Sequence, residues 1–322
     1  MTVQGAPMTH AKPMTTHAQA PSASALSVGE NPPTQAAVPA TRKRADLDWA
    51  GMIPFLLCHV VVFAAFWTGV TWQAALLCVV LYVARMFGVT AGYHRYFSHR
   101  TYEMGRVMQF LMAFLAETSA QRGVMWWAAH HRHHHLHSDD PTDRHSPAQQ
   151  GFMESHMGWI FRKDVDATNF DRVKDLSKNP ELRWLDRHWL VPPTLLAAAS
   201  LALFGWSGLV IGFFLSTCLT WHGTYTINSL SHVFGKRRFE TKDTSRNNAL
   251  LAMITLGEGW HNNHHHYMNA ARCGFYPREI DITYIGLLAL EKMGLVWGLK
   301  KVPQRVLDEG RARDAGQMGS AT

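Results

Sequence analysis

Cysteine is scarce in this chain, which has four in 322 residues. Cys58, Cys78 and Cys218 lie inside apolar runs, and Cys273 stands alone. No two of them have the spacing of a zinc knuckle or of a disulfide framework. We therefore interpret all four thiols as small apolar packing groups.

The common catalytic motifs are absent as well. The sequence contains no HExxH, GxSxG, GxGxxG or Walker pattern. It therefore gives no support to a metalloprotease, a serine hydrolase or a nucleotide-binding domain.

Charged residues are missing from several long stretches. Residues 49–70 contain no Asp, Glu, Lys or Arg, and residues 72–92 are apolar except for Arg85. Each stretch is long enough to cross the roughly 30 Å hydrocarbon layer of a bilayer. Two further apolar runs, at 189–204 and 209–229, are separated only by a Gly-Trp-Ser-Gly turn. We therefore predict an all-α integral membrane protein with four transmembrane helices in two hairpins.

Basic residues flank the apolar runs on one side only. The connection between the second and third runs is rich in Arg and Lys, whereas the turns near Thr71 and Gly205 carry none. By the positive-inside rule, residues 93–188 and 230–302 form a cytoplasmic cap, and both termini face the cytoplasm. The net charge of +7 then fits contact with anionic lipid headgroups and does not require nucleic acid.

The two ends of the chain differ from its middle. Residues 1–41 are rich in Ala, Pro, Thr and Ser and show no apolar periodicity, so we expect a disordered tail without a cleaved signal peptide. Residues 303–322 are expected to form a flexible tail. The membrane domain that carries the function would then be 42–302.

Histidine is abundant, and part of it is spaced regularly. Two clusters have the spacing i, i+3, i+4: His131, His134 and His135, and His261, His264 and His265. On a helix this spacing brings all three side chains to one face. Two such helices facing each other would supply six metal ligands.

A third cluster consists of His94 and His99. These residues are five apart, or about 140° around an ideal α-helix, so they should either serve different metals or lie where the helix ends. Asn228 and His232 form an i, i+4 pair at the end of the fourth run. His232 is a candidate ninth ligand with an adjacent amide, or a helix-end histidine that interacts with the macrodipole.

Other polar residues have less specific signals. Acidic candidates for orienting the imidazoles lie nearby in sequence: Asp139, Asp140, Asp143 and Glu258. We interpret His59 and His222 as hydrogen-bonded packing residues inside the runs. The remaining histidines beside the clusters should mostly support the ligands or lie at the surface: His130, His133, His137, His145, His156 and His266. Arg85 is either functional or reaches toward the cytoplasmic interface.

The donor set points to redox metals. A structural zinc ion takes four ligands and usually recruits cysteine, whereas nitrogen donors from distant segments suit a pair of first-row redox metals. Iron changes oxidation state and binds oxygen, and an unactivated C–H bond is beyond any protein side chain. Oxidation of a lipid is therefore the leading hypothesis.

Four segments follow one another in the order HRYFSH, WWAAHHRHHH, NSLSHVFG and GEGWHNNHHHY. With them, the chain from about Trp49 to Trp297 resembles the membrane acyl-CoA desaturases of the stearoyl-CoA delta-9 type. The resemblance implies a di-iron centre that uses molecular oxygen and two electrons. Such a centre removes two hydrogens from a saturated acyl chain and leaves a cis double bond, here expected at delta-9.

The resemblance also implies how the ligands are shared between the two irons. One iron would be held by His94, His135, His232, His261 and His265. The other would be held by His99, His131, His134 and His264, with Asn228 acting through a water molecule.

Four substrate contacts are implied in the same way. Gln121 would contact the acyl thioester, and Trp127 would line the acyl tunnel. Cys78 and Tyr82 would seal the closed end of that tunnel. Replacing Tyr82 with Ala should then lengthen the preferred acyl chain.

The headgroup of the substrate is less clearly implied. Arg162 and Lys163 stand where basic residues meet phosphate, which favours acyl-CoA. However, Ala129 and His130 replace the Arg-Asp pair with which animal members of the family bind CoA, so an acyl-lipid or acyl-ACP substrate competes. Arg144 is a further departure, because the family commonly has proline there.

The electrons must come from another protein, since the chain carries no haem-binding or iron-sulfur segment. A ferredoxin or a cytochrome b5-like protein, with its reductase, is implied. The basic cytoplasmic surface would attract an acidic donor.

Two other functions use similar residues. A membrane fatty acid or alkane hydroxylase would add one oxygen to its product instead of removing two hydrogens. A histidine-rich metal transport or storage protein would place its ligands along the spans instead of at one membrane face.

Overall fold

The computed structural model describes residues 1–2 and 47–317. The chain divides into Met1–Ala40 and a compact unit, Thr41–Thr322, and the fold below is that of the second unit. Apart from residues 1–2, the predicted disordered tail at 1–41 lies outside the described residues.

Three continuous helical stretches of the described part are long and apolar enough to cross a membrane: Trp49–Thr68, Trp72–Ser98 and Val191–Val233. The first contains α1 (Trp49–Val62) and α2 (Ala65–Thr68). The second contains α3 (Trp72–Phe87) and the π-helix η1 (Gly88–Ser98). The third contains α9 (Val191–Ser207), the π-helix η5 (Gly208–Leu215), α10 (Ser216–Asn228) and α11 (Leu230–Val233).

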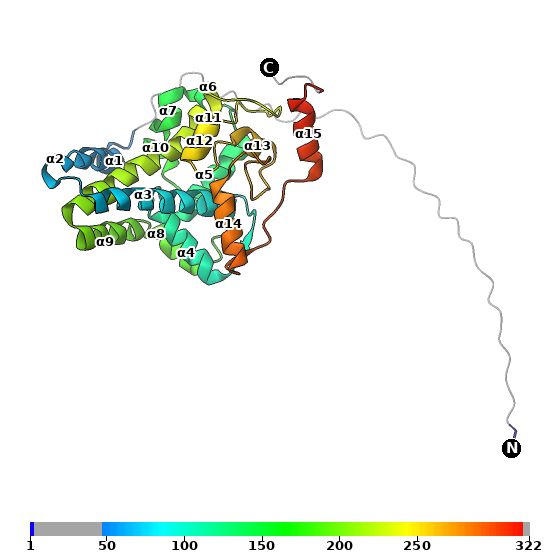
Figure 1. The fold of residues 1–322 in the computed structure, drawn as a ribbon, viewed down its shortest axis with the longest axis horizontal. Helices are drawn as coiled ribbons and strands as arrows, with labels where there is room; N and C mark the ends of the chain where they lie inside the picture. Colours follow the sequence, from blue (N-terminus) through cyan, green and yellow to red (C-terminus); the bar gives the residue numbers. More distant parts are fainter. Residues whose placement is uncertain (3–46, 318–322) are drawn as a thin grey trace. The chain divides into compact units, whose positions relative to one another are not determined.

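The third stretch bends back on itself at Gly205. This residue has φ 64° and ψ −161°, a left-handed conformation that glycine adopts without steric cost. Beyond it, η5 packs against α9, so the two segments form a hairpin (Figure 1). The turn predicted between residues 189–204 and 209–229 therefore corresponds to this bend, which lies within one helical stretch of 43 residues.

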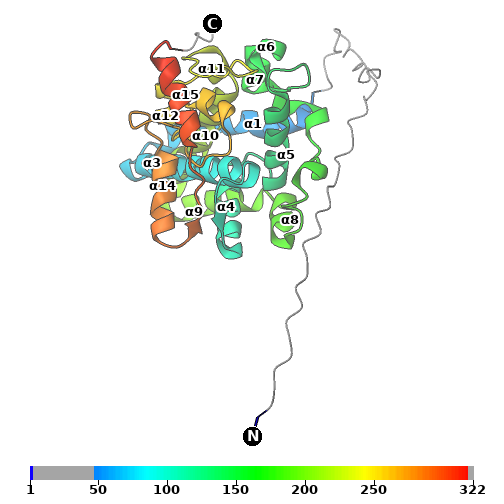
Figure 2. The same ribbon diagram turned by 90° about the vertical axis from the view of Figure 1, so that its right-hand side faces the viewer.

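Shorter elements form a cap at one end of these helices (Figures 1 and 2). The α-helices of the cap are α4 (Arg106–Glu117), α5 (Val124–His137), α6 (Pro147–Gln150), α7 (Phe152–His156), α8 (Pro180–Arg187), α12 (Ala249–Ile254), α13 (His261–His266), α14 (Ile282–Lys292) and α15 (Gln304–Asp314). Three 3₁₀ turns follow α7: η2 (Gly158–Phe161), η3 (Lys163–Val165) and η4 (Phe170–Val173). β1 (Glu103–Met104) pairs antiparallel with β2 (Val296–Trp297), with Glu103 opposite Trp297.

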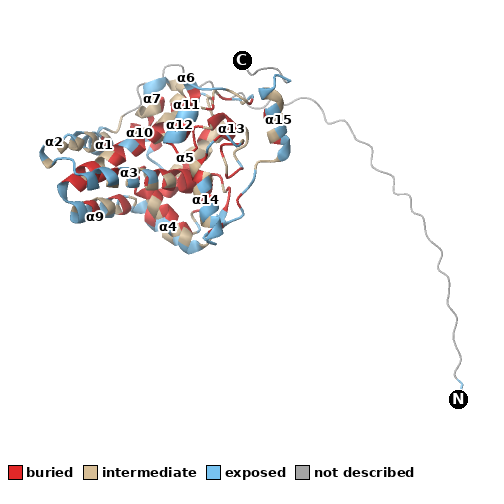
Figure 3. Ribbon diagram, in the orientation of Figure 1, coloured by how far each residue is buried: buried red, intermediate tan, exposed pale blue. Residues whose placement is uncertain are grey.

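The main core lies where the long helices enter the cap. Buried residues of η1, α4 and α5 pack together there, among them Tyr93, Phe97, Met112 and Met125. Figure 3 shows this central burial, while the outer faces of α1, α3 and α9 are exposed. Those faces carry apolar side chains such as Leu56 and Val79, as expected for helices surrounded by lipid.

The predicted flexible tail at 303–322 is wrong for its first half. Residues 304–314 form α15, and Val306 is 1% exposed in a cluster with Phe239 and Phe275. The helix is mostly polar and buries only a narrow apolar stripe, so its composition resembles that of a tail. Residues 318–322 lie outside the described part.

Two carboxyl groups fix the start of α5, which carries the second histidine cluster. Oε1 of Glu117 accepts a hydrogen bond from the amide of Val124 at 3.1 Å. Oδ1 of Asp186 accepts from the amides of Met125 at 2.8 Å and Trp126 at 3.2 Å. The first amides of a helix have no partner within the helix, so these side chains satisfy them and orient α5.

This arrangement predicts a pH-dependent stability. Burial raises the pKa of Glu117 from 4.5 to about 8, so the folded chain holds a proton that the unfolded chain releases. Stability should therefore fall as the pH rises between these two values. The full slope is about 1.4 kcal/mol per pH unit, and it decreases near pH 8, where the folded-state carboxyl group itself begins to ionise. The free energy of unfolding should therefore fall by about 2 kcal/mol between pH 6 and pH 8.

Glu117→Gln keeps an acceptor for the Val124 amide but cannot ionise. In detergent, the variant should lose less stability than the unsubstituted chain between pH 6 and pH 8, measured by thermal unfolding. Equal losses in the two proteins would contradict this assignment.

Candidate metal centre

His94 and His99 come together because their segment is a π-helix. In η1 the backbone bonds residue i to residue i+5, and the amide of His99 donates to the carbonyl of His94 at 3.2 Å. Residues five apart then lie about one turn apart, and the two rings are 4.8 Å apart between centroids. The 140° separation predicted for an α-helix is therefore wrong. His99 does lie at the end of the helix, as the second interpretation required.

The structure gathers the nine predicted ligand histidines into two groups. The five-histidine group contains His94, His99, His131, His135 and His264. The four-histidine group contains His134, His232, His261 and His265. Within each group the candidate ligand nitrogens lie within 4.8 Å of one another. The division implied by the resemblance is different, since it placed His94 and His135 with His232 and His134 with His264.

The spacing of the nitrogens fits metal coordination. Nε2–Nε2 distances of 2.9–3.1 Å join neighbouring rings: His94 with His264, His99 with His131, His135 with His264, and His232 with His261. Two nitrogens that bind one ion at about 2.1 Å and at right angles lie about 3.0 Å apart. All-imidazole donors suit iron and its neighbours in the first transition row. The residues present therefore fit a pair of such ions.

The electrostatic environment keeps many of these rings in the form that binds metal. Burial and the neighbouring histidines lower the pKa of His131, His135, His261 and His264 well below 6.5. These imidazoles are therefore neutral at physiological pH. A neutral ring can donate a lone pair from Nε2 without first losing a proton.

Carboxylates lie beside the Nδ1 atoms of four ligand candidates. Nδ1 of His94 is 2.6 Å from Glu258, and Nδ1 of His134 is 3.0 Å from Asp143. His232 and His265 have the same relation to Asp139, at 3.4 Å, and to Asp243, at 2.8 Å. Such partners orient an imidazole and raise its basicity as a ligand.

Three of the four acidic residues predicted from the sequence therefore have this role. Asp140 does not, because it contacts His137, which belongs to neither group. Asp243 was missed, since it is 22 residues from His265 in sequence and no spacing links them. Burial would raise the pKa of Glu258, but His94 and Arg95 lower it to about 2, so this carboxylate stays ionised.

Backbone strain is concentrated around the site. Among the described residues, five that are not glycine have positive φ: Arg100, Ala120, Arg122, Asp139 and Leu256. Arg100 follows His99, and Ala120 and Arg122 flank Gln121. Asp139 contacts His232, and Leu256 lies two residues before Glu258. Strained residues of this kind persist where the surrounding structure holds them in place, which is common at functional sites.

A cavity of about 420 Å³ adjoins the five-histidine group. Its lining is mostly apolar and aromatic, and it includes the predicted substrate residues Gln121 and Trp127 as well as His131 and Asn228. Trp127 stacks on His131 with ring centroids 4.9 Å apart. Nε2 of Gln121 donates to Oγ1 of Thr224 at 3.0 Å, which joins the strained loop to α10. The cavity therefore connects an apolar space directly to a ligand candidate.

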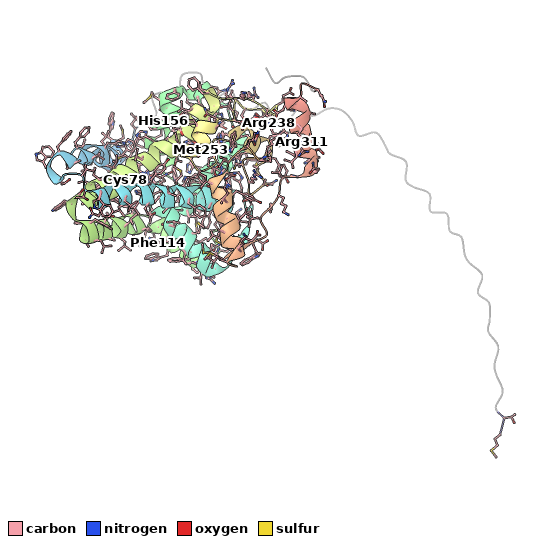
Figure 4. The ribbon with its side chains drawn as sticks, viewed as in Figure 1. Cys78, Phe114, His156, Arg238, Met253 and Arg311 are labelled. Carbon is pink, nitrogen blue, oxygen red and sulfur yellow. The ribbon has the colours of Figure 1, made fainter. Side chains whose placement is uncertain are left out.

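Cys78 and Tyr82 lie elsewhere. They line a separate apolar cavity of about 330 Å³ between α3, α10 and α12, and Figure 4 shows Cys78 on α3. The hydroxyl of Tyr82 donates to the carbonyl of Ile254 at 2.7 Å. The structure therefore does not place these two residues at the end of the cavity beside the histidines, because they lie on a different face of α10.

The predicted phosphate contacts also differ from expectation. Arg162 is buried, and its guanidinium lies 3.3 Å from Glu154 and 3.2 Å from Asp164, while Lys163 is exposed. Asp164 also pairs with Arg144 at 2.5 Å. Arg144, which stands where the family commonly has proline, is thus one member of an ion-pair cluster.

The polar residues inside the long helices form their own contacts. Nδ1 of His59 is 2.8 Å from the carbonyl of Phe55, and the Nε2 atoms of His59 and His222 are 3.1 Å apart. Their interpretation as hydrogen-bonded packing residues is confirmed. Arg85 is fully buried and donates to Thr217 at 2.6 Å, so it does not reach out to the interface.

Comparison with known proteins agrees with this geometry. A family model described as fatty acid desaturase matches residues 70–273. The chain is 34% identical over 255 residues to an sn-2 palmitoyl-lipid 9-desaturase of Nostoc sp. (strain 36), covering 78% of this chain and 89% of that protein. It is 31% identical over 264 residues to an sn-1 stearoyl-lipid 9-desaturase of Anabaena variabilis (81% and 97%).

An acyl-CoA 5-desaturase of Anemone leveillei is also similar, with 34% identity over 252 residues, 77% of this chain and 78% of that protein. The matches to these relatives span most of both partners, and the residues matched by the family model include all three histidine clusters. The chain therefore belongs to the fatty acid desaturase family.

Proposed function

We propose that this chain is an oxygen-dependent di-iron desaturase that introduces a cis double bond, at delta-9, into a saturated acyl chain. The observation that carries the proposal is the contact between the five-histidine group and the apolar cavity, made by His131 and Trp127. Bound iron would supply the oxygen-activating chemistry that no side chain has. The cavity would hold the methylene groups of the acyl chain beside the bound iron.

Each part of the chain then has a defined task. The five-histidine and four-histidine groups would hold one iron each, and Asn228 would hold a water molecule beside one of them. The carboxylates of Glu258, Asp139, Asp143 and Asp243 would keep the imidazole rings oriented. The apolar wall of the cavity would exclude bulk water from the reacting methylene groups.

The membrane arrangement is part of this proposal. The hairpin at Gly205 supports four crossings, because it divides the longest helical stretch into two antiparallel halves. With the basic residues on the side of the cap, we place the cap, both termini and the metal centre in the cytoplasm. A ferredoxin or a cytochrome b5-like protein, with its reductase, would supply the two electrons there.

The ion pairs near the cavity bear on the headgroup. Arg122, which lines the cavity, pairs with Asp166 at 2.7 Å, and Arg144 and Arg162 both pair with Asp164. The phosphates of CoA would need basic groups that are free to bind them. Two of the three relatives above are named as acyl-lipid desaturases. These observations favour an acyl chain carried on a glycerolipid over acyl-CoA.

Expression in cells fed an isotope-labelled saturated fatty acid tests the function. The double bond should map to carbon 9, and the product should be two hydrogens lighter than the substrate. At early times the label should become unsaturated in glycerolipids before it does so in the acyl-CoA pool. The opposite order would contradict the headgroup assignment, and a cell that forms no new double bond would contradict the function.

The lining of the cavity suggests a residue that limits chain length. Cys58 lines the cavity nine positions into α1, about 14 Å along the helix from its start. Cys58→Trp should therefore shift the product toward shorter chains by about two or more carbons. Tyr82→Ala, in the other cavity, should leave chain length unchanged, in contrast to the expectation from resemblance. Gas chromatography of the products from both variants shows whether Cys58 or Tyr82 limits the chain length.

A further inference from the structure

The short helix α13 supplies three of the nine ligand candidates, yet it is only six residues long. Isolated helices shorter than about 12 residues are marginal in water, so α13 depends on its surroundings to keep His261, His264 and His265 in place. These histidines occupy the inner side of α13, within the two groups. The other side carries Asn262, Asn263 and His266.

Asn262 and Asn263 are fully buried and fully engaged. Oδ1 of Asn262 accepts from the amides of Arg238 and Phe239, each at 2.8 Å, and its Nδ2 donates to the carbonyl of Phe239 at 3.0 Å. Oδ1 of Asn263 accepts from Nη1 of Arg238 at 3.0 Å, and its Nδ2 donates to Glu279 at 2.8 Å. Asn247 and Cys273 also bond to Asn263. Arg238 and Phe239 hold Asn262 and share in holding Asn263, so they are part of the set of residues that positions α13.

These two residues are held in turn by α15. Nε of Arg238 donates to both carboxylate oxygens of Asp314, at 3.0 and 3.1 Å, and Figure 4 labels Arg238 beside α15 and its Arg311. Phe239 is fully buried in a cluster with Phe275 and Val306. A Cβ atom at Gly310 would lie 2.8 Å from the ring of Phe239, so this position of α15 has no room for a side chain unless its neighbours move.

A direct contact completes the connection. Nε2 of His266 lies 3.2 Å from Oε2 of Glu309, and the ring of His266 stacks on Phe239 with centroids 4.0 Å apart. The outer face of α13 is thus held by α15 both directly and through Arg238 and Phe239.

We propose that α15 is a clasp for the metal centre, meaning that it holds the third histidine cluster in position. The chain releases iron slowly while this helix is packed against Phe239 and His266, and quickly when the helix is displaced. The inference rests on the proposed di-iron function. Glu309, Gly310 and Asp314 are positioning residues in this account, because they act on the ligands through Arg238, Phe239 and His266. The C-terminal helix then belongs to the site and is more than a tail beside it.

The test is the rate at which the purified full-length enzyme loses iron to an Fe(II) chelator, measured well below its unfolding temperature. Gly310→Val would place side-chain atoms against Phe239 and Tyr276 and unseat α15. Loss of groups that support metal ligands typically weakens metal binding 10–100-fold. Gly310→Val, and a chain ending at Val302, should therefore release iron at least about tenfold faster.

Matched variants separate this role from general stability. Glu309→Ala should release iron faster, whereas Glu309→Gln, which still offers an acceptor to His266, should behave as the unsubstituted chain does. The double variant Asp308→Ala/Arg311→Ala removes an exposed ion pair of the same helix and should leave the release rate unchanged.

Unchanged iron release in Gly310→Val and Glu309→Ala, with helical content intact by circular dichroism, would overturn the proposal that α15 holds the third cluster in position. If the truncated chain or Gly310→Val does not accumulate, Glu309→Ala against Glu309→Gln decides. An unsubstituted chain that binds no iron would instead contradict the proposed function.

Discussion

Replacing His264 with alanine should abolish desaturation and remove about one of the two irons. His264 is buried at the centre of the five-histidine group, and its Nε2 lies 2.9 Å from that of His94 and 3.1 Å from that of His135. The other four histidines of the group each already offer a nitrogen within 4.8 Å of the rest, so none of them is free to replace it. Iron content and product formation are measured on the same preparation.

His133→Ala is the matched control, because His133 belongs to neither group. It should keep both irons and most of the activity. A fully active His264→Ala enzyme would contradict the assignment of the group.

Pairs of these substitutions also test how the ligands are divided. His135 and His264 share a group in the structure, so the double variant His135→Ala/His264→Ala should retain about one iron. His134 and His264 belong to different groups, so His134→Ala/His264→Ala should retain none. The division implied by resemblance predicts the reverse for both pairs, and iron analysis of the two double variants therefore distinguishes the two divisions.

Replacing Glu258 with alanine should damage both the fold and the metal centre. One carboxylate oxygen lies 2.6 Å from His94, and the other lies 2.9 Å from Arg95, which is 1% exposed. Removing one partner of a buried ion pair typically costs 3–5 kcal/mol. Loss of a group that supports a ligand should weaken metal binding about 10–100-fold.

Thermal unfolding and chelator titration of the Glu258→Ala variant measure these two effects. Asp140→Ala is the control, since Asp140 is a half-exposed partner of His137 and should cost less than about 1 kcal/mol. Similar losses in the two variants would show that Glu258 has no special role.

The histidine pattern could be predicted from the sequence because it depends on local spacing. The repeated i, i+3, i+4 clusters on α5 and α13 need only helical geometry to place three side chains on one face. The same reasoning failed for His94 and His99, because an α-helix was assumed where the chain forms a π-helix. No simple sequence signal marks that change of winding, and the division of ligands between the groups depends on it.

Contacts between segments that are far apart in the chain could not be predicted from the sequence either. Asp243 beside His265, and α15 against Phe239, depend on how loops return to the site. The position of each cavity depends on which face of α10 meets α1 or α3, so the sequence could not show that Cys78 and Tyr82 line a different cavity from the one beside the histidines. Polar composition predicted a tail at residues 304–314, whereas burial of Val306 makes this segment a packed helix.

The central claim is that nine histidines from three clusters and from His232 form two iron sites in one chain. The most direct test is the iron-to-protein ratio of the full-length protein, purified under conditions that exclude free metal. The account predicts about two irons per chain and about one in His264→Ala. A ratio near zero, or a ratio that His264→Ala leaves unchanged, would contradict it.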